Sequence, residues 1–315
     1  MRDLRIVFMG TPEFAVTILK KILEEGYNVA GVITAPDKPA GRGRKLQVSA
    51  VKSYAVSQGL EVLQPTNLKS PDFIEKLHTL KPNVQVVVAF RMLPKIVWDF
   101  PEYGTFNLHA SLLPQYRGAA PINWAIINGE KVTGVSTFFL DEKIDTGEII
   151  LKKEVDIAPT DNVGDLHDKL MNEGAGLVVE TLELIKNEQV TTQKQDLKNH
   201  LKEAPKLNRD NTRINWNAPV EIINNHIRGL NPYPAAWSEL FNGDEVLSVQ
   251  IFNVKVEKED HDFENGMIFS DNKIIKVSVP GGFINILEIK LPGKRKMKVS
   301  DLLNGYKLEA HAKLV

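Results

Sequence analysis

The chain has 315 residues, 43% of them hydrophobic, a net charge of −1 at pH 7 and no cysteine. This length allows two domains with separate cores, and the absence of cysteine excludes disulfides, zinc–thiolate sites and thiol nucleophiles. The near-neutral charge argues against a globally basic nucleic-acid binder but leaves local basic patches open.

The first half of the chain alternates apolar runs with segments of helical period, which is typical of a parallel sheet with crossover helices. The predicted strands are Arg5–Met9, Asn28–Ile33, Val84–Ala89, Thr105–Leu108, Val135–Phe139 and Glu148–Val155. The predicted helices are Phe14–Glu25, Val48–Gln58, Asp72–Leu80 and Val163–Lys186. We therefore predict an α/β catalytic domain over residues 1–188, with a Rossmann-like, mostly parallel sheet.

The second half changes character after a polar stretch over residues 189–206, which we interpret as a linker. Pro219–Leu230 has a helical pattern. From Trp237 onward, short alternating segments are separated by the turn sequences NGD, ENG, PGG and PGK. This pattern predicts a small, OB-like β-barrel in a C-terminal domain over residues 207–315.

The first turn, MGTPEF, lies where a dinucleotide-binding fold carries its glycine-rich loop. It has one glycine instead of three, and Pro12 and Glu13 replace the open backbone that a pyrophosphate needs, so a nicotinamide cofactor is disfavoured. Two interpretations remain. The turn is a tight strand-to-helix connection, or it lines a pocket at the sheet edge.

Residues 107–118, NLHASLLPQYRG, hold the strongest chemical signal. Asn107 and His109 are two residues apart on a predicted strand and should face one side of the sheet. A carboxamide and an imidazole there suit the polarisation of a carbonyl and the movement of a proton. Asp145, in LDEKIDTG, could approach the ring, set its tautomer and favour its charged form. The alternative is that DTG is only a turn.

Two segments are rich in basic residues. Lys38–Lys52 holds five basic side chains and no acidic one, with glycines beside Arg42 and Arg44, which suggests a flexible loop for an anionic backbone. A second cluster surrounds the turn at Pro292. Each cluster could instead be solvated surface or a protected β edge. Together, two basic patches fit a long polyanion better than a small phosphate ester.

Other kinds of site find no support in the sequence. His78, His167 and His200 lie in polar surroundings and are interpreted as surface residues. Histidine pairs with metal-ligand spacing and a GxSxG elbow are both absent, which disfavours a structural zinc and serine-hydrolase chemistry. No apolar run approaches the roughly 20 residues of a membrane span, and a strand pattern begins almost at once. We therefore expect a cytoplasmic monomer without a signal peptide.

NLHASLLPQYRGAAPINWAI, followed by GVSTFFLDEKIDTGEII, resembles the catalytic core of the folate-dependent formyltransferases. RIVFMGTPEFAV, VITAPDKPAGRGRKL and IRGLNPYPAAW extend the resemblance over nearly the whole chain. It implies transfer of a formyl group from 10-formyltetrahydrofolate to an amine without a metal. The implied catalytic residues are Asn107, His109 and Asp145.

For the folate, the resemblance implies two walls around the catalytic residues. These are Phe90, Arg91 and Leu93 on one side, and Ser111, Leu112, Leu113, Pro114, Gln115 and Tyr116 on the other. One departure is the segment AFRMLP, where family members often have an aromatic–glycine pair.

The β-rich second domain favours the members of this family that formylate initiator methionyl-tRNA for translation initiation. The implied tRNA-binding residues are Lys38, Arg42, Arg44, Lys45, Lys294, Arg295, Lys296 and Lys298. Two alternatives stay open. One is a formyltransferase acting on another amine, such as an amino sugar nucleotide, and the other is a nucleic-acid-binding module with a vestigial catalytic site.

Overall fold

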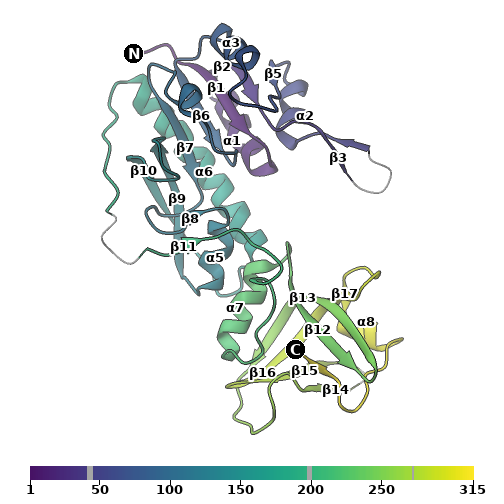
Figure 1. Ribbon diagram of the computed structural model, residues 1–315. Helices are drawn as coiled ribbons and strands as arrows, with labels where there is room; N and C mark the ends of the chain where they lie inside the picture. The colour runs from purple at the N-terminus through teal and green to yellow at the C-terminus, as the bar shows by residue number, and fades with distance from the viewer. Residues whose placement is uncertain (41–44, 197–200, 272) are drawn as a thin grey trace. The chain divides into compact units, whose positions relative to one another are not determined.

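The computed structural model describes residues 1–40, 45–196, 201–271 and 273–315. Its chain divides into two compact units, each with its own hydrophobic core (Figure 1). The first unit comprises Met1–Gly118, Val132–Asp156 and His167–Glu203. The second comprises Ala119–Lys131, Ile157–Leu166 and Ala204–Val315.

The first unit is built on a seven-stranded sheet in the order β10-β9-β7-β6-β1-β2-β5. Neighbouring strands from β7 to β5 are parallel, whereas β9 is antiparallel to both β7 and β10. The predicted Rossmann-like, mostly parallel sheet is confirmed. Its strands are β1 (Arg5–Gly10), β2 (Asn28–Ile33), β5 (Val62–Leu63), β6 (Val84–Val88), β7 (Thr105–His109), β9 (Val132–Phe139) and β10 (Ile149–Asp156).

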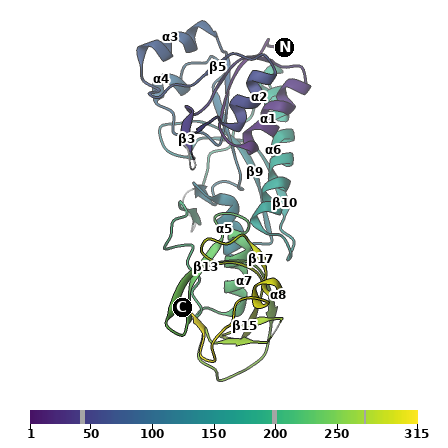
Figure 2. The same cartoon turned by 90° about the vertical axis from the view of Figure 1, so that its right-hand side faces the viewer.

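Helices cover both faces of this sheet because its strands are apolar on both sides. On one face, Val7 and Met9 of β1 pack with Phe73 and Leu77 of α3. On the other, the Thr137 hydroxyl of β9 lies 2.8 Å from the Thr181 hydroxyl of α6. Figure 2 shows α3 and α4 on one side of the sheet and α6 on the other. The helices are α1 (Glu13–Glu24), α2 (Ala50–Ser57), α3 (Pro71–Thr79), α4 (Lys95–Trp98) and α6 (Val163–Lys186).

The turn between β1 and α1 requires a glycine for close packing. A Cβ added to Gly10 would lie 2.6 Å from the Ala15 Cβ and 2.9 Å from the Phe8 ring. Real Cβ atoms do not approach so closely, so the bare backbone of Gly10 lets the helix start against the strand. This geometry agrees with the interpretation of MGTPEF as a tight strand-to-helix connection.

Two regions expected to lack regular structure contain paired strands. β3 (Lys38–Ala40) and β4 (Lys45–Gln47) form a two-stranded sheet at either end of the predicted basic loop, so Lys38 and Lys45 stand on strands. The polar segment interpreted as a linker also pairs with the first unit. The backbone N–H of Gln193 donates to the Ile149 carbonyl at 2.8 Å, and the Ile149 N–H returns the bond at 2.9 Å. The short strands β8 (Arg117–Gly118) and β11 (Glu203–Ala204) make another pair.

The second unit is a nearly closed antiparallel barrel, as predicted. Its strands follow the order β14-β15-β16-β13-β12-β18, with β17 added beside β16, and a bridge between Met267 and Lys313 links the two edges. They are β12 (Ala236–Asn242), β13 (Glu245–Glu257), β14 (Ile268–Ser270), β15 (Ile275–Val279), β16 (Gly282–Lys290), β17 (Met297–Lys298) and β18 (Lys313–Leu314).

Among the described residues, the helices that lie wholly in this unit are α5 (Pro121–Ile127), α7 (Val220–Leu230) and α8 (Val299–Leu303). The amphipathic α7 buries Ile223 and Ile227 against the barrel strands. α5, which the sequence did not predict, packs against α7, and the Asn123 side chain donates to the Gly229 carbonyl at 2.8 Å.

Candidate active site

Two polar side chains of β7 face the same side of the first unit's sheet. Asn107 and His109 are two residues apart on the strand, and side chains alternate between faces. Leu108 faces α6, because a Cβ added to Gly174 of that helix would lie 2.8 Å from a Leu108 methyl group. Asn107 and His109 therefore face away from α6, at the carboxyl end of a parallel strand, where α/β sheets bind their ligands.

The His109 ring is buried, with a defined proton position. Its Nε2 lies 2.8 Å from the backbone carbonyl of Tyr116, and the residue is 7% exposed. A carbonyl only accepts hydrogen bonds, so Nε2 carries a hydrogen and, in the neutral ring, Nδ1 carries the lone pair. The Tyr116 carbonyl thus sets the tautomer that the sequence interpretation assigned to Asp145.

Asp145 is the carboxylate nearest to this ring among the residues that the structure describes. Its Oδ2 lies 3.9 Å from His109 Nδ1, and both side chains are largely buried. That distance is too long for a direct hydrogen bond but short enough to stabilise a protonated imidazole. The same oxygen accepts a hydrogen bond from the backbone N–H of Gly118 at 3.2 Å.

The loop that carries Asp145 has a constrained backbone. Asp145 adopts a φ of 54°, a left-handed conformation that few residues other than glycine and Asn or Asp tolerate. Gly147 is required for a different reason, since a Cβ there would lie 1.7 Å from the Phe139 carbonyl oxygen. The DTG sequence is therefore a turn, and the turn brings the carboxylate to the imidazole.

Gln195 holds this loop and was missed in the sequence. Its side-chain amide donates to the backbone carbonyls of Asp145, at 3.0 Å, and Gly147, at 2.7 Å. Its side-chain oxygen accepts a hydrogen bond from the Arg117 guanidinium. The residue lies in a polar stretch and its partners are mostly backbone groups, so no side-chain pattern marks it.

Arg117 is the second residue of this site that the sequence analysis did not identify. Its Nε is buried and has no hydrogen-bond partner among the described residues. Burial lowers the pKa of the Arg117 guanidinium, while the nearby carboxylates of Asp145 and Asp141 oppose that shift. A positive charge thus lies near the Asp145 carboxylate.

The segment from Ser111 to Tyr116, predicted as one folate wall, is fixed by its own hydrogen bonds. The Ser136 hydroxyl of β9 donates to the Ser111 carbonyl at 2.7 Å and accepts from the Leu113 N–H at 3.1 Å. The Ser111 hydroxyl donates to the Gln115 carbonyl at 2.6 Å. The side chains of Ser111, Leu113 and Tyr116 are buried, whereas those of Leu112, Pro114 and Gln115 are half-buried.

The other predicted wall follows β6. Phe90 is half-buried and Leu93 is buried in the core beside α4. The Arg91 guanidinium is turned to backbone carbonyls, donating to Thr66 at 3.0 Å and also to Pro65. Side-chain contacts to a ligand are therefore open chiefly to Phe90.

The predicted tRNA-binding residues fall into different units. Lys38 is exposed on β3, Lys45 stands on β4, and Arg42 and Arg44 lie outside the described residues. In the second unit, Lys294, Arg295, Lys296 and Lys298 are exposed around β17. Lys296 is 3.1 Å from the Glu288 carboxylate, which offsets its charge.

The Asn107 carboxamide is half-buried and has no hydrogen-bond partner among the described residues, so both of its N–H groups can serve a ligand. Nowhere in the described ranges do three or more His, Asp or Glu side chains gather as a metal site would need. Within the same ranges, no helix is long and apolar enough to cross a membrane.

Comparison with known proteins follows the division into two units. A family model described as "Formyl transferase" matches residues 4–182, and one described as "Formyl transferase, C-terminal domain" matches residues 206–307. The methionyl-tRNA formyltransferase of Flavobacterium johnsoniae is 55% identical over 314 residues, covering 100% of both chains. That of Bacteroides thetaiotaomicron is 53% identical over 311 residues, covering 97% of each.

Solved structures share this fold at low sequence identity. The N-formyltransferase of Helicobacter canadensis, in complex with folinic acid and dTDP-3-aminofucose, has a TM-score of 0.65 at 21% identity, with 93% of this chain and 100% of that chain covered. Glycinamide ribonucleotide transformylase 1 of Symbiobacterium toebii has a TM-score of 0.51 at 22% identity, with 61% and 94% covered.

Proposed function

The chain belongs to the formyl transferase family, and on that premise we propose that it transfers a formyl group from 10-formyltetrahydrofolate to the amino group of initiator methionyl-tRNA. The acceptor follows from full-length relatives that carry the name methionyl-tRNA formyltransferase. The observation that carries the chemistry is the placement of Asn107, His109 and Asp145 at one edge of the sheet.

The reaction needs a donor for a developing negative charge. When an amine attacks the formyl carbon, charge builds on the formyl oxygen, and the free N–H groups of Asn107 can donate to it. Loss of one such donor typically raises the barrier by about 3–4 kcal/mol.

The reaction also needs a proton to move from the attacking amine to the departing nitrogen. Because His109 Nε2 is committed to the Tyr116 carbonyl, Nδ1 is the ring atom that can take and return this proton. Asp145 Oδ2, at 3.9 Å, stabilises the imidazolium in between. Gln195 and Gly118 fix the loop and the carboxylate for this purpose.

The donor folate is proposed to bind between the two predicted walls. The side chains of Leu93, Leu113 and Tyr116 are buried, and Arg91 is bonded to the backbone. Contacts to the pteridine ring would therefore come from backbone groups of these residues and from half-buried side chains such as Phe90 and Leu112.

A single acceptor comparison tests the proposal. Formyl transfer from 10-formyltetrahydrofolate is measured with methionyl-tRNA, a dTDP-amino sugar and glycinamide ribonucleotide. We expect kcat/KM for methionyl-tRNA to exceed the others by at least about 100-fold. Higher activity on either small amine would refute the tRNA assignment.

The same assay on His109→Ala links turnover to this site. We expect a loss of roughly 100- to 10,000-fold in kcat, together with a lower melting temperature, because the change removes a buried ring and its hydrogen bond to the Tyr116 carbonyl. Unchanged turnover would place the chemistry elsewhere, and the absence of any transfer by the wild type would support a nucleic-acid-binding module with a vestigial site.

A further inference from the structure

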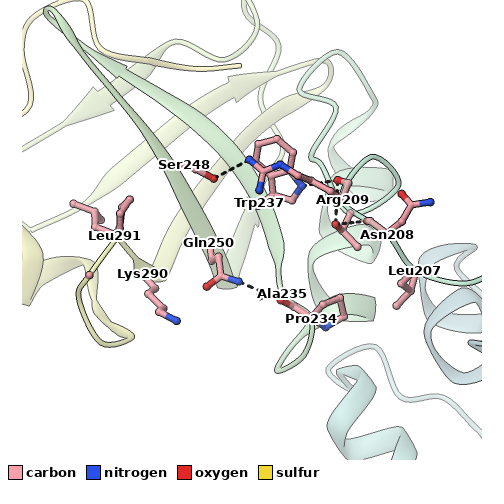
Figure 3. Close-up of a pocket in the computed structure, with 13 residues that line it drawn as sticks. Leu207, Asn208, Arg209, Pro234, Ala235, Trp237, Ser248, Gln250, Lys290 and Leu291 are labelled. Atoms are coloured by element: carbon pink, nitrogen blue, oxygen red, sulfur yellow. Dashed lines mark hydrogen bonds between the residues drawn. The ribbon is translucent and has the colours of Figure 1, made fainter. Parts of the chain in front are cut away.

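The second unit contains a pocket that the catalytic site does not use. Its volume is about 520 Å³, within the range of small-ligand sites. Figure 3 shows Lys290 and Leu291 on one side, with Trp237 and Arg209 on the other. The lining residues come from the segment after β11, from the loop before β12 and the start of that strand, from β13, and from the end of β16 and the turn after it.

The charged side chains that line this pocket are all basic. Of the described residues that line it, Arg209 and Lys290 are basic and none is acidic. In the part of the chain that the structure describes, no carboxylate oxygen comes within 4.0 Å of either cation. Arg213 also approaches the Trp237 ring, at 5.2 Å, but Glu239 neutralises it at 2.7 Å. The two cations of the pocket are thus available to an anion.

The planar guanidinium of Arg209 is held in place by two contacts. It lies 3.8 Å from the centre of the Trp237 ring and donates to the Ser248 hydroxyl at 3.4 Å. The indole N–H donates in return to the Arg209 carbonyl at 2.7 Å. A guanidinium stacked on an aromatic ring keeps its outer face for another planar group, and unpaired bases of RNA stack on such planes.

Gln250 adds a polar group between the two sides. It pairs with Lys290 across β13 and β16, so the two side chains leave neighbouring strands together. The Gln250 amide donates to the Pro234 carbonyl at 3.2 Å, and its side-chain oxygen has no hydrogen-bond partner among the described residues. That oxygen can accept a hydrogen bond from a base or a ribose hydroxyl.

We propose that this pocket binds one unpaired nucleotide of the RNA acceptor, with its phosphate between Arg209 and Lys290 and its base on the Arg209 plane. The assignment rests on the proposed function, since the RNA is the acceptor in that reaction. An unpaired nucleotide fits better than a duplex, because a duplex hides the base face that a guanidinium plane would contact. The predicted basic cluster around the turn at Pro292 includes Lys290, whereas Arg209 lies outside both predicted clusters.

The test uses the full chain and a labelled single-stranded RNA trinucleotide, with binding followed by fluorescence anisotropy at several salt concentrations. We expect Lys290→Ala to weaken binding about 5- to 10-fold. It should also lower the salt slope, which is the steepness with which the logarithm of the binding constant falls with the logarithm of the salt concentration, by about one. Lys255→Ala, on an exposed residue of the neighbouring strand β13 that does not line the pocket, should change binding less than about 2-fold. Equal effects of the two variants would overturn the proposal.

A second comparison separates stacking from charge. Arg209→Lys keeps the cation but removes the plane, so it should reduce the preference for the trinucleotide over an abasic trinucleotide while leaving the salt slope intact. A preference that survives this change, or a duplex that binds as tightly as the strand, would contradict the stacked-base arrangement. Equal affinity for adenosine 5′-monophosphate would make a free nucleotide the ligand.

These titrations do not depend on turnover. If the wild type binds the trinucleotide as expected but formylates no tRNA, the proposed function fails, and the pocket remains a site for a nucleotide of an RNA that is not the formyl acceptor. If tRNA is formylated and Lys290→Ala leaves its KM unchanged, the pocket assignment fails alone.

Discussion

At the scale of single residues, the Asp145 carboxylate is positioned chiefly through its backbone. Its left-handed conformation and the two bonds from Gln195 act on the backbone of the loop, whereas the Gly118 N–H donates to the carboxylate itself. Buried carbonyls that lose their donor cost about 1–3 kcal/mol each. A residue distant in the sequence, Gln195, can therefore decide where the carboxylate lies.

Gln195→Ala should lower kcat about 5- to 50-fold and leave KM for both substrates nearly unchanged, because the change displaces the Asp145 loop and removes no substrate contact. Gln193→Ala is the matched control. That side chain is exposed in the same segment, and its pairing with Ile149 is through the backbone. Steady-state kinetics on both variants decide the matter, and equal losses would mean that the whole segment, not Gln195, matters.

Gln195→Glu adds a rescue test. The carboxylate keeps the acceptor for Arg117 but has no N–H for the carbonyls of Asp145 and Gly147. We expect it to stay impaired in kcat, and full recovery would show that only the contact with Arg117 is needed.

A different residue, His226 of α7, couples stability to pH. Burial lowers the pKa of its imidazole below 6.5, and backbone carbonyls of Thr212 and Arg213 only partly offset this. The unfolded chain therefore binds a proton at a higher pH than the folded chain. The free energy of unfolding should fall as pH drops below about 6.5, by at most about 1.4 kcal/mol per pH unit for this group.

Urea unfolding of the wild type and His226→Gln between pH 7.5 and 5.5 measures that contribution. The wild type should lose more stability than the variant over this interval, since the variant has no proton to gain. Parallel losses in the two proteins would show that acidic groups alone account for the pH dependence.

At the scale of elements, the turn from β9 to β10 combines a packing need with a functional one. The Phe139 N–H donates to the Glu148 carbonyl at 3.0 Å, so the hairpin closes where Gly147 passes the Phe139 carbonyl. Asp145, whose carboxylate approaches His109, precedes Gly147 in this turn. Any change that opens the turn should therefore affect both stability and turnover.

Gly147→Ala should destabilise the protein by about 3 kcal/mol, because the new methyl group would meet backbone that cannot move aside. Gly176→Ala, in the middle of α6, is the opposite case: nothing lies within 4 Å of its added Cβ. It should stabilise by roughly 0.5–1 kcal/mol through helix propensity. Denaturant midpoints test the pair, and a neutral Gly147→Ala would show that the turn relaxes.

The elements that the sequence predicts well are those with a clear period. The strands around Phe8, Val86 and Phe106 and the helix at Val163 appear within a few residues of their predicted bounds. The sequence does not predict the β3–β4 pair, because its residues do not alternate between apolar and polar. The sequence does not identify Gln195 and Arg117 as site residues, because their partners are backbone carbonyls or buried side chains distant in sequence. Only the fold brings those groups together.

At the scale of the whole molecule, recognition of a long polyanion should depend on charge spread over several segments. Each cation that meets a phosphate adds to the salt dependence of binding. The basic loop around Arg42 was predicted to act on the tRNA, whereas the folate was assigned to the walls near Phe90 and Ser111. The two substrates should therefore respond to different variants.

Arg42→Ala should weaken methionyl-tRNA binding about 5- to 10-fold and reduce the salt slope by about one, while the affinity for the folate donor stays the same. Lys76→Ala removes an equal charge from the exposed side of α3 and should leave both unchanged. Titrations of each substrate over a range of salt provide the measurement. Equal weakening of folate and tRNA by Arg42→Ala would contradict the separate assignment.

The packing of α5 against α7 has a consequence for the order of folding during synthesis. α5 ends at Ile127 and its partner helix begins only at Val220. At a ribosomal rate of about 5–20 residues per second, the apolar side of α5 stays exposed for several seconds before α7 is synthesised. During this time, the strands on either side of α5 in the sequence can already join the first sheet. Nascent chains of intermediate length should therefore be the forms of this protein most exposed to chaperones.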